Sequence, residues 1–444
     1  MTDVISKIRE AKAESRRLAA QPTPVKDSAL AAMAEALDAS RTVILDANAK
    51  DVENARAEGL GKVMLKRLLV DDAKIDSMIA GIRSVIALKD PVGDTMSSMD
   101  LDDGLTLYQI SCPIGLIGVI FESRPDVVPQ IMSLCLKSGN GVVFKGGREA
   151  TETNRALFSI LRDSVADIVP AKSFVMIETR EDVNAILGLN DCIDLLIPRG
   201  SNEFVRFIQQ NTSIPVLGHA AGICHVYIDA DADLEKAWNV ALDSKVQYPA
   251  VCNAMETLLV NATVAERFLP KMCQMLKDNN VEIRCDPLSI GYMDGAVPAS
   301  DEDWDTEYND YVLSVRIVDS VEDAVEFINT HGSHHTDAII TENPQRIAYF
   351  INNVDSADVF VNASTRFADG YRFGKGAEVG ISTNKIHSRG PVGMEGLMIY
   401  KYVLIGEGQV VKDYVGDSAR PYKHKVTDKI LEMRIWTGNR FSPM

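Results

Sequence analysis

Residues 115–145 read GLIGVIFESRPDVVPQIMSLCLKSGNGVVFK. Segments 115–121 and 141–145 are almost entirely apolar and rich in β-branched or aromatic side chains, which predicts two buried strands. Between them, residues 127–136 carry apolar side chains at helical spacing. A strand, a helix and another strand in succession are typical of a parallel sheet covered by helices. This stretch therefore places the chain in the α/β class.

The alternation of helices and strands continues on both sides of this stretch. Helices are expected where apolar residues recur at helical spacing, in 4–18, 28–37, 73–88 and 203–210. Strands are expected at 105–111, 174–177 and 192–197, and a second α/β set with strands near 258–260, 314–318, 337–340 and 359–362. Residues 398–405 and 409–411 are expected to pair as a projecting β-hairpin.

The composition is that of an ordinary soluble globular protein, with 444 residues, 46% of them apolar and 25% charged. No apolar run is long enough to cross a bilayer, and residues 1–9 lack the apolar core of a signal peptide. We therefore expect a cytoplasmic protein without a membrane partner. The net charge of −17 disfavours nucleic acid. The locally basic tail 416–444 has no aromatic residues interleaved with its basic ones, so we interpret it as a surface helix or arm.

One of the seven cysteines stands in a distinctive context. Their irregular spacing, without a CxxC pair, argues against a disulfide framework or a structural zinc site. Cys252 follows Tyr-Pro-Ala-Val and precedes Asn-Ala-Met-Glu-Thr, just ahead of the apolar run 258–260. This arrangement predicts a turn whose backbone N–H groups can hold a thiolate. Cys135 and Cys273, in apolar surroundings, are interpreted as core cysteines.

Two turns at the ends of expected strands favour a phosphate-bearing ligand. Gly200 and Ser201 lie between a strand and a helix, so the helix N-terminus could receive a phosphate. The segment from Lys145 to Arg148 ends another strand with two cations around two glycines. Either turn alone could be an ordinary polar turn, and the two together favour a dinucleotide.

A series of motifs in order along the chain resembles the gamma-glutamyl phosphate reductase family of the aldehyde dehydrogenase superfamily. These motifs are Pro113–Gly115, Phe121–Pro125, Gly141–Gly147, Pro198–Ser201, the Cys252 segment, His331–Ile340, Val361–Thr365 and Arg389–Gly396. The resemblance ends at about residue 415 and does not cover the tail.

The resemblance implies an aldehyde-dehydrogenase-like α/β fold with three parts. These are a Rossmann-type cofactor domain at 1–104 and 114–223, an α/β catalytic domain at 224–397, and a β-hairpin oligomerisation arm at 105–113 and 398–415. The extension 416–444 has no assigned role. An exposed apolar hairpin needs a covering partner, so a homodimer or homotetramer is expected.

The resemblance also assigns roles to particular residues. Cys252 becomes the nucleophile, Lys145 the contact to the adenosine ribose, Gly200 and Ser201 the pyrophosphate turn, and Glu307 the holder of the nicotinamide ribose. Arg148 stands where NAD-preferring relatives commonly carry a glutamate. A cation there would accept a 2′-phosphate, so NADPH is expected over NADH.

Two departures from the general aldehyde dehydrogenase pattern carry meaning. Oxidising members use a glutamate base to activate water, whereas the corresponding segment 218–222 here, Gly-His-Ala-Ala-Gly, has no carboxylate. They also use an asparagine at the oxyanion, where this chain has Arg124. Arg124 could be structural; as a catalytic residue it would suit a substrate that carries phosphate.

The substrate residues are the least determined by the sequence. His331, His334 and His335 suggest a metal, but adjacent histidines on an extended segment point opposite ways, so we expect no metal site. The resemblance places them on a loop facing the substrate, and we take His335 as the contact, although the sequence does not distinguish the three. Asn362, Ser364 and Thr365 end an expected strand and could line the site or simply form the turn.

The activity that the resemblance implies is NADPH-dependent reduction of the small molecule L-glutamyl 5-phosphate. The products are L-glutamate 5-semialdehyde and phosphate, formed through a thioacyl intermediate on Cys252, in the second step of proline biosynthesis from glutamate. Association with glutamate 5-kinase is left open. One alternative, an aldehyde-oxidising dehydrogenase, is disfavoured by the missing glutamate base. Another, a non-catalytic scaffold, is disfavoured by the retention of Cys252 together with both cofactor turns.

Overall fold

The computed structural model describes residues 2–178 and 180–431. Contacts divide the chain into two compact units. Unit 1 comprises Met1–Ile197, Thr212–Pro215 and Gly393–Met444, and unit 2 comprises Pro198–Asn211 and Val216–Val392. Within the described ranges, no helix combines the length and apolar character needed to cross a bilayer. The α/β class predicted from the sequence is confirmed.

A four-stranded sheet with the order β5-β4-β3-β6 organises the body of unit 1. Its strands are β3 (Leu116–Phe121), β4 (Gly141–Lys145), β5 (Phe174–Ile177) and β6 (Leu195–Arg199). β3, β4 and β5 run parallel. Every residue of β3 is buried, as expected for a parallel strand with both faces covered. The strands predicted at 115–121, 141–145 and 174–177 are confirmed, and the strand predicted at 192–197 begins later, at Leu195.

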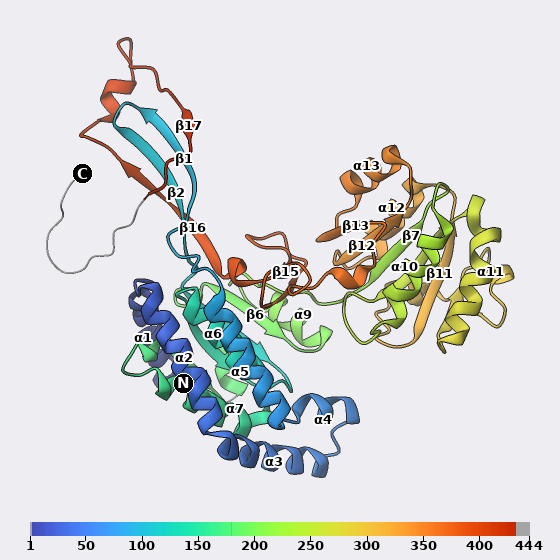
Figure 1. Cartoon of the computed structure of the whole chain (residues 1–444), viewed down its shortest axis with the longest axis horizontal. Helices are drawn as coiled ribbons and strands as arrows, with labels where there is room; N and C mark the ends of the chain where they lie inside the picture. The colour runs from blue at the N-terminus through green and yellow to red at the C-terminus, as the bar shows by residue number, and fades with distance from the viewer. Residues whose placement is uncertain (1, 179, 432–444) are drawn as a thin grey trace. The chain divides into compact units, whose positions relative to one another are not determined.

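Unit 1 also holds a set of helices, most of them labelled in Figure 1. They are α1 (Thr2–Ala19), α2 (Thr23–Ala39), α3 (Arg41–Ala57), α4 (Lys62–Leu68), α5 (Asp72–Ala87), α6 (Val127–Lys137), α7 (Thr151–Ser164) and α8 (Arg180–Leu187). α5 illustrates the sequence logic: the Asp71 side chain accepts from the backbone N–H of Lys74 at 2.8 Å and caps the helix. Its residues at helical spacing, including Ile75, Ile79 and Ile82, are buried.

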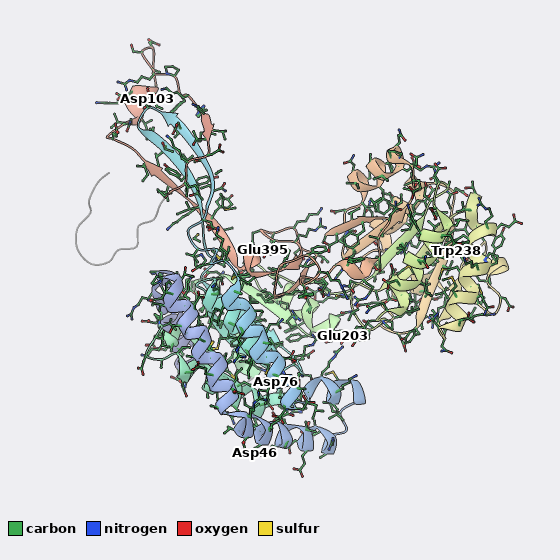
Figure 2. The ribbon with its side chains drawn as sticks, viewed as in Figure 1. Asp46, Asp76, Asp103, Glu203, Trp238 and Glu395 are labelled. Carbon is green, nitrogen blue, oxygen red and sulfur yellow. The ribbon has the colours of Figure 1, made fainter. Side chains whose placement is uncertain are left out.

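An antiparallel sheet with the order β16-β2-β1-β17 forms the arm. Its strands are β1 (Thr95–Asp102), β2 (Leu105–Pro113), β16 (Met398–Ile405) and β17 (Lys425–Thr427). The hairpin of the arm is β1–β2, with Asp103 in its turn (Figure 2). β17 belongs to the tail, so part of the C-terminal extension contributes a strand to the arm. Residues 432–444 of that extension lie outside the described residues.

The predicted hairpin between 398–405 and 409–411 is wrong. β16 pairs instead with β2, from Met398 opposite Pro113 to Ile405 opposite Thr106. Residues 409–411 do not form a strand: the Gln409 side chain donates to the carbonyl of Asp103 in the β1–β2 turn at 2.9 Å, and Val411 begins a 3₁₀ turn. Local alternation of side chains identified β16 but not its partner, which lies almost three hundred residues earlier in the chain.

A seven-stranded parallel sheet with the order β10-β9-β11-β8-β7-β12-β13 forms the core of unit 2. The strands are β7 (Cys224–Ile228), β8 (Met255–Asn261), β9 (Glu282–Cys285), β10 (Val297–Pro298), β11 (Val312–Val318), β12 (Thr336–Ile340) and β13 (Asp358–Val361). The helices are α9 (Asn202–Gln210), α10 (Leu234–Val246), α11 (Ala262–Asp278), α12 (Val321–His331) and α13 (Pro344–Asn353), and a small ribbon pairs β14 (Gly380–Ser382) with β15 (Gly390–Val392).

Two hydrophobic clusters hold the unit 2 sheet between its helices. In one of them, Trp238 of α10, labelled in Figure 2, stacks on Phe268 of α11 with ring planes 3° apart. Its Nε1 donates to the carbonyl of Phe268 at 3.0 Å. The strands predicted in this half of the chain are all present. This packing fixes the neighbouring strands β8, β7 and β12, from which the candidate site is built.

Candidate active site

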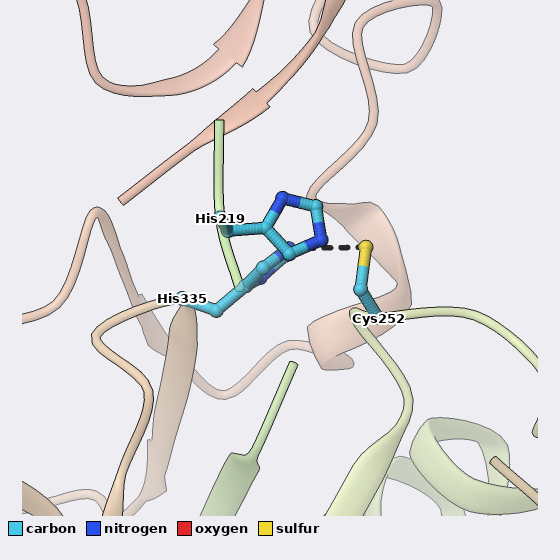
Figure 3. A group of neighbouring side chains, drawn as sticks. All are labelled: His219, Cys252 and His335. Carbon is cyan, nitrogen blue, oxygen red and sulfur yellow. Dashed lines mark hydrogen bonds between the residues drawn. The ribbon is translucent and has the colours of Figure 1, made fainter. Parts of the chain in front are cut away.

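Three neighbouring parallel strands bring one cysteine and two histidines together. His219 lies shortly before β7, Cys252 shortly before β8, and His335 directly before β12. The order β8-β7-β12 places these three positions at one edge of the sheet, the edge where the strands begin. Their ligand atoms all lie within 4.8 Å of one another. Figure 3 shows both histidine rings turned toward the cysteine sulfur.

Cys252 sits on a tight turn, which confirms the turn predicted there; that its backbone N–H groups hold the thiolate stays a prediction. The backbone N–H of Ala254 donates to the carbonyl of Val251 at 3.0 Å. The Asn253 side chain donates to the carbonyl of Ala368 at 2.7 Å. A Cβ added to Gly222 would lie 2.4 Å from the Cα of Cys252. Only glycine fits there without displacing Cys252.

Both histidines direct one ring nitrogen away from the sulfur and one toward it. His335 is buried; its Nδ1 lies 2.8 Å from the Thr336 hydroxyl, and its Nε2 lies 3.2 Å from Cys252 Sγ. The Thr336 hydroxyl donates in turn to Asp358 at 3.4 Å. His219 Nδ1 contacts the carbonyl of Ile381 at 2.9 Å, and the two rings meet edge to face with centroids 5.0 Å apart. These outer contacts orient both Nε2 atoms toward the sulfur.

The charges of the neighbouring side chains determine the protonation states of Cys252 and His219. Burial alone would raise the pKa of the Cys252 thiol, but the charges and hydrogen bonds of His335 and His219 outweigh it and hold this pKa well below its usual value. Burial alone would lower the pKa of His219; the Cys252 thiolate and the carbonyl of Ile381 raise it to about 9. The arrangement therefore favours a thiolate beside an imidazolium at neutral pH.

A second thiol, that of Cys224, contacts the backbone of Cys252 but does not share its low pKa. Cys224 Sγ donates to the carbonyl of Cys252 at 3.2 Å. Burial raises the pKa of the Cys224 thiol well above its usual value, so it remains an inert thiol. The seven cysteines are all free.

A buried ion pair connects β8, the strand that follows Cys252, to the loop that carries Glu307. Lys245 Nζ and Glu256 Oε2 are 2.6 Å apart, and both side chains are fully buried. Burial raises the pKa of Glu256 to about 7 against the opposing charge of Lys245. Glu256 also accepts from the backbone N–H of Asn309 at 3.1 Å. The start of β8 is thereby tied to the segment around Glu307.

The residues predicted for the cofactor fall into both units. In unit 2, Ser201 precedes the first turn of α9, and Asn202 of that turn donates to Glu307 at 2.7 Å, so Gly200, Ser201 and Glu307 are neighbours. In unit 1, Lys145 ends β4, and Arg148 begins a 3₁₀ turn, where it is exposed and lies 3.5 Å from Glu58. Arg124 also belongs to unit 1, and its catalytic role stays a prediction.

The residues predicted for the substrate have different surroundings. Asn362 uses both halves of its amide on the backbone of Thr341, at 3.0 Å each, which is a structural contact. The Ser364 hydroxyl accepts from Ser244 at 3.2 Å and caps a 3₁₀ turn. The Thr365 hydroxyl is buried and has no partner among the described residues. Thr365 is thus the one of the three whose side-chain polar atom contacts no other described residue.

The three histidines of the 331–335 segment separate in the structure. His331 contacts Asp305 at 2.8 Å, and His334, with a positive φ of 59°, contacts the carbonyl of Asp355 at 2.8 Å. Only His335 reaches Cys252. The other ring beside the sulfur, His219, was missed from the sequence. The signal was its position in the segment 218–222, where oxidising relatives carry their catalytic glutamate.

Comparisons with known proteins agree with this geometry. The model of the aldehyde dehydrogenase family matches residues 1–290. The chain is 61% identical to the gamma-glutamyl phosphate reductase of Methanosarcina mazei over 441 residues, which cover 97% of this chain and 99% of that one. It is 40% identical to the crystal structure of the gamma-glutamyl phosphate reductase of Thermotoga maritima, with a TM-score of 0.90 and coverage of 92% and 99%.

A more distant structure shares the fold alone. It is a glyceraldehyde-3-phosphate dehydrogenase from Methanocaldococcus jannaschii complexed with NADP, 15% identical, with a TM-score of 0.62 and coverage of 91% and 94%.

The charge arrangement at Cys252 predicts an unusual pH profile for its alkylation. Because the thiolate is the reactive form and its pKa is held low, the rate with iodoacetamide should stay nearly constant from about pH 9 to about pH 7. An ordinary thiol, with a pKa of about 8.5, would lose about tenfold per pH unit below that value. Peptide mass spectrometry after timed labelling measures the rate.

Cys112 provides the internal reference in the same digest, because burial raises the pKa of its thiol. The His335→Gln variant should show a rate that falls as the pH decreases, since a neutral amide cannot stabilise the thiolate. A wild-type profile for Cys252 that parallels the profile of Cys112 would contradict the assignment.

Proposed function

The chain belongs to the aldehyde dehydrogenase family and, within it, to the gamma-glutamyl phosphate reductases, and from this premise we propose its reaction. The enzyme reduces L-glutamyl 5-phosphate to L-glutamate 5-semialdehyde and phosphate through a thioacyl intermediate on Cys252, in the second step of proline biosynthesis from glutamate. The observation that carries the proposal is the Cys252 sulfur held beside the Nε2 of His335 at 3.2 Å and beside His219.

The first step uses the preformed thiolate. Sγ of Cys252 attacks the acyl carbon, a C–S bond forms, the C–O bond to the phosphate breaks, and phosphate leaves with the electron pair. No base has to remove a proton at this moment, because the sulfur is already charged. His335 and His219 are oriented by their outer contacts, so the stabilising charges stand in place before the substrate arrives.

The second step returns the sulfur to its starting state. When bound, a reduced nicotinamide dinucleotide supplies the hydride that brings the thioacyl carbon to the aldehyde level. As the C–S bond breaks, its electron pair returns to Sγ, where the two histidines again stabilise the thiolate. A sulfur with a low pKa is a good leaving group as well as a nucleophile, and both properties are needed here.

Reduction requires the thioacyl group to survive until hydride arrives. The segment 218–222, which lies beside the nucleophile through Gly222 and His219, contains no carboxylate that could activate water. The missing carboxylate supports reduction over hydrolysis of the acyl group.

The turns predicted to bind the cofactor carry groups that attract the phosphates of a dinucleotide. Gly200 and Ser201 lie at the N-terminus of α9, where backbone N–H groups favour an anion. The amide of Asn154, buried against Gly146, has no partner for its Nδ2 or Oδ1 among the described residues. The exposed cation of Arg148 would pair with a 2′-phosphate, which supports NADPH as the cofactor. Lys145 would contact the ribose and Glu307 the nicotinamide ribose.

The arm offers an apolar strand at the edge of its sheet for assembly. β16 is an edge strand, and its side chains Ile399, Tyr402 and Leu404 are exposed by 39%, 63% and 53%. An uncovered apolar edge strand is an association surface, so a homodimer or homotetramer forms through it. The free state of all seven cysteines suits the reducing cytoplasm, where this reaction would take place.

The reverse reaction tests substrate and mechanism together. Glutamate 5-semialdehyde should reduce NADP only when phosphate is present, and Cys252→Ser should lower the rate on the order of 10³-fold or more, because a hydroxyl is a far weaker nucleophile. Cys273→Ser is the matched control, since a hydroxyl can keep the contact of that thiol with the carbonyl of Asp294. Phosphate-independent turnover, or a Cys252→Ser variant of near-normal rate, would refute the scheme.

Arg148 tests the cofactor preference. Arg148→Glu should lower kcat/KM for NADPH about 10- to 100-fold, because it removes a charge-assisted hydrogen bond to the 2′-phosphate, and should leave kcat/KM for NADH nearly unchanged. Arg162→Glu, an exposed position on α7 of the same unit, is the charge-matched control. Equal losses with both cofactors would point to a general defect and remove Arg148 from the site.

The arm is tested by oligomeric state. Tyr402→Glu should convert the assembly to monomers, because a charge placed on the apolar strand cannot be buried against a second copy. Light scattering at micromolar concentration measures the mass, and Val43→Glu, on an exposed position of α3, should leave it unchanged. A wild-type chain that is already monomeric would contradict assembly through the arm.

A further inference from the structure

The group His219, Cys252 and His335 has the composition and spacing of a metal site as well as of a nucleophile. Its three ligand atoms lie within 4.8 Å of one another. We propose that these residues bind one Zn²⁺ ion and that this binding reversibly inactivates the enzyme. The binding itself follows from the geometry alone, whereas the loss of activity also rests on the function proposed above.

The donor set selects the ion. One thiolate and two imidazoles are ligands that Zn²⁺ prefers over Mg²⁺ or Ca²⁺, which bind oxygen. In a tetrahedral site with Zn–S of about 2.3 Å and Zn–N of about 2.0–2.1 Å, the ligand atoms are about 3.5 Å apart. The separation of 3.2 Å between Cys252 Sγ and His335 Nε2 is close to this value, and small movements of the His219 ring complete the set.

The outer contacts of both rings are those of metal-binding histidines. A histidine that binds a metal through one nitrogen usually donates its other N–H to a carbonyl, a carboxylate or a water. His219 Nδ1 faces the carbonyl of Ile381, and His335 Nδ1 faces the hydroxyl of Thr336, which donates to Asp358. Both Nε2 atoms are thus oriented before any ion arrives, and the ion takes the place of the Nε2 proton of the imidazolium, which is released to solvent.

The site is open to the ion on one side. Cys252 and His219 are only partly buried, whereas His335 is fully buried. Three protein ligands leave a fourth position for water, as in sites where the metal exchanges. The ion acts as an inhibitor because it occupies the sulfur electron pair that would otherwise attack the acyl carbon. Zinc and an acyl group on Cys252 therefore exclude each other.

Cobalt provides the spectroscopic probe. Titration of the whole protein with Co²⁺ should produce, at one ion per chain, a sulfur-to-cobalt charge-transfer band together with the intense visible bands of tetrahedral Co²⁺, and Zn²⁺ should displace both. Cys252→Ser should remove the charge-transfer band, and His219→Gln should weaken binding at least tenfold. Cys273→Ser should keep the band at full strength. Absence of the band in the wild type, or its persistence in Cys252→Ser, would overturn the proposal.

Labelling of the wild type gives a second readout that needs no variant and no turnover. Zn²⁺ should slow the alkylation of Cys252 by iodoacetamide at least tenfold, and EDTA should restore the original rate, while the labelling of Cys112 stays constant. Unchanged alkylation of Cys252 in saturating Zn²⁺ would equally overturn the site. Since neither readout uses catalysis, a failure of the proposed reaction and a failure of the zinc site are distinguishable.

Discussion

The interaction on which the rest of this molecule depends is the contact between a sulfur and two imidazole rings. A partly buried thiolate without partners would be disfavoured, because removing a charge from water carries a large penalty. The Nε2 of His335, 3.2 Å from Cys252 Sγ, and the His219 ring reverse that preference. Their own Nδ1 atoms are held by Thr336 and Ile381. The negative charge on Cys252 therefore depends on the folded arrangement that brings both histidines to the sulfur.

The surrounding structure keeps this contact in register. The beginnings of β8, β7 and β12 carry the three residues, and the parallel pairing of these strands sets their separation. The backbone of Gly222 packs directly on Cys252, while Lys245 and Glu256 anchor the start of β8 inside the core. Removing one member of such a buried pair leaves an uncompensated charge, so it would disturb the start of β8, which closely follows the Cys252 turn.

Much of this fold could be predicted from the sequence because long apolar runs mark parallel strands regardless of their partners. The buried strands β3 and β4 and the amphipathic helix α5 were recognisable in this way. α3 was not, because its inward face is partly polar: Asp51 is buried and accepts from the backbone N–H of Thr153 at 2.7 Å. The pairing of β16 with β2 was also out of reach, since strand alternation does not encode a distant partner.

The candidate site, like the fold, could be predicted only in part from the sequence. The turn at Cys252 follows from local residue types. Its two imidazole neighbours, His219 and His335, lie 33 residues earlier and 83 residues later in the chain. Their convergence depends on the order of strands in the sheet, which no local pattern specifies. Asn362 illustrates a different case: its substrate role stays a prediction, while the structure shows its amide bonded to the backbone of Thr341.

The most direct test of the central claim is to isolate the acylated enzyme. Incubation with L-glutamyl 5-phosphate in the absence of any reduced nicotinamide, followed by rapid quenching and peptide mass spectrometry, should reveal a glutamyl group on the peptide that contains Cys252. Addition of NADPH before quenching should clear it. If product forms at the normal rate and no such adduct is found on Cys252, a covalent route through this sulfur is contradicted.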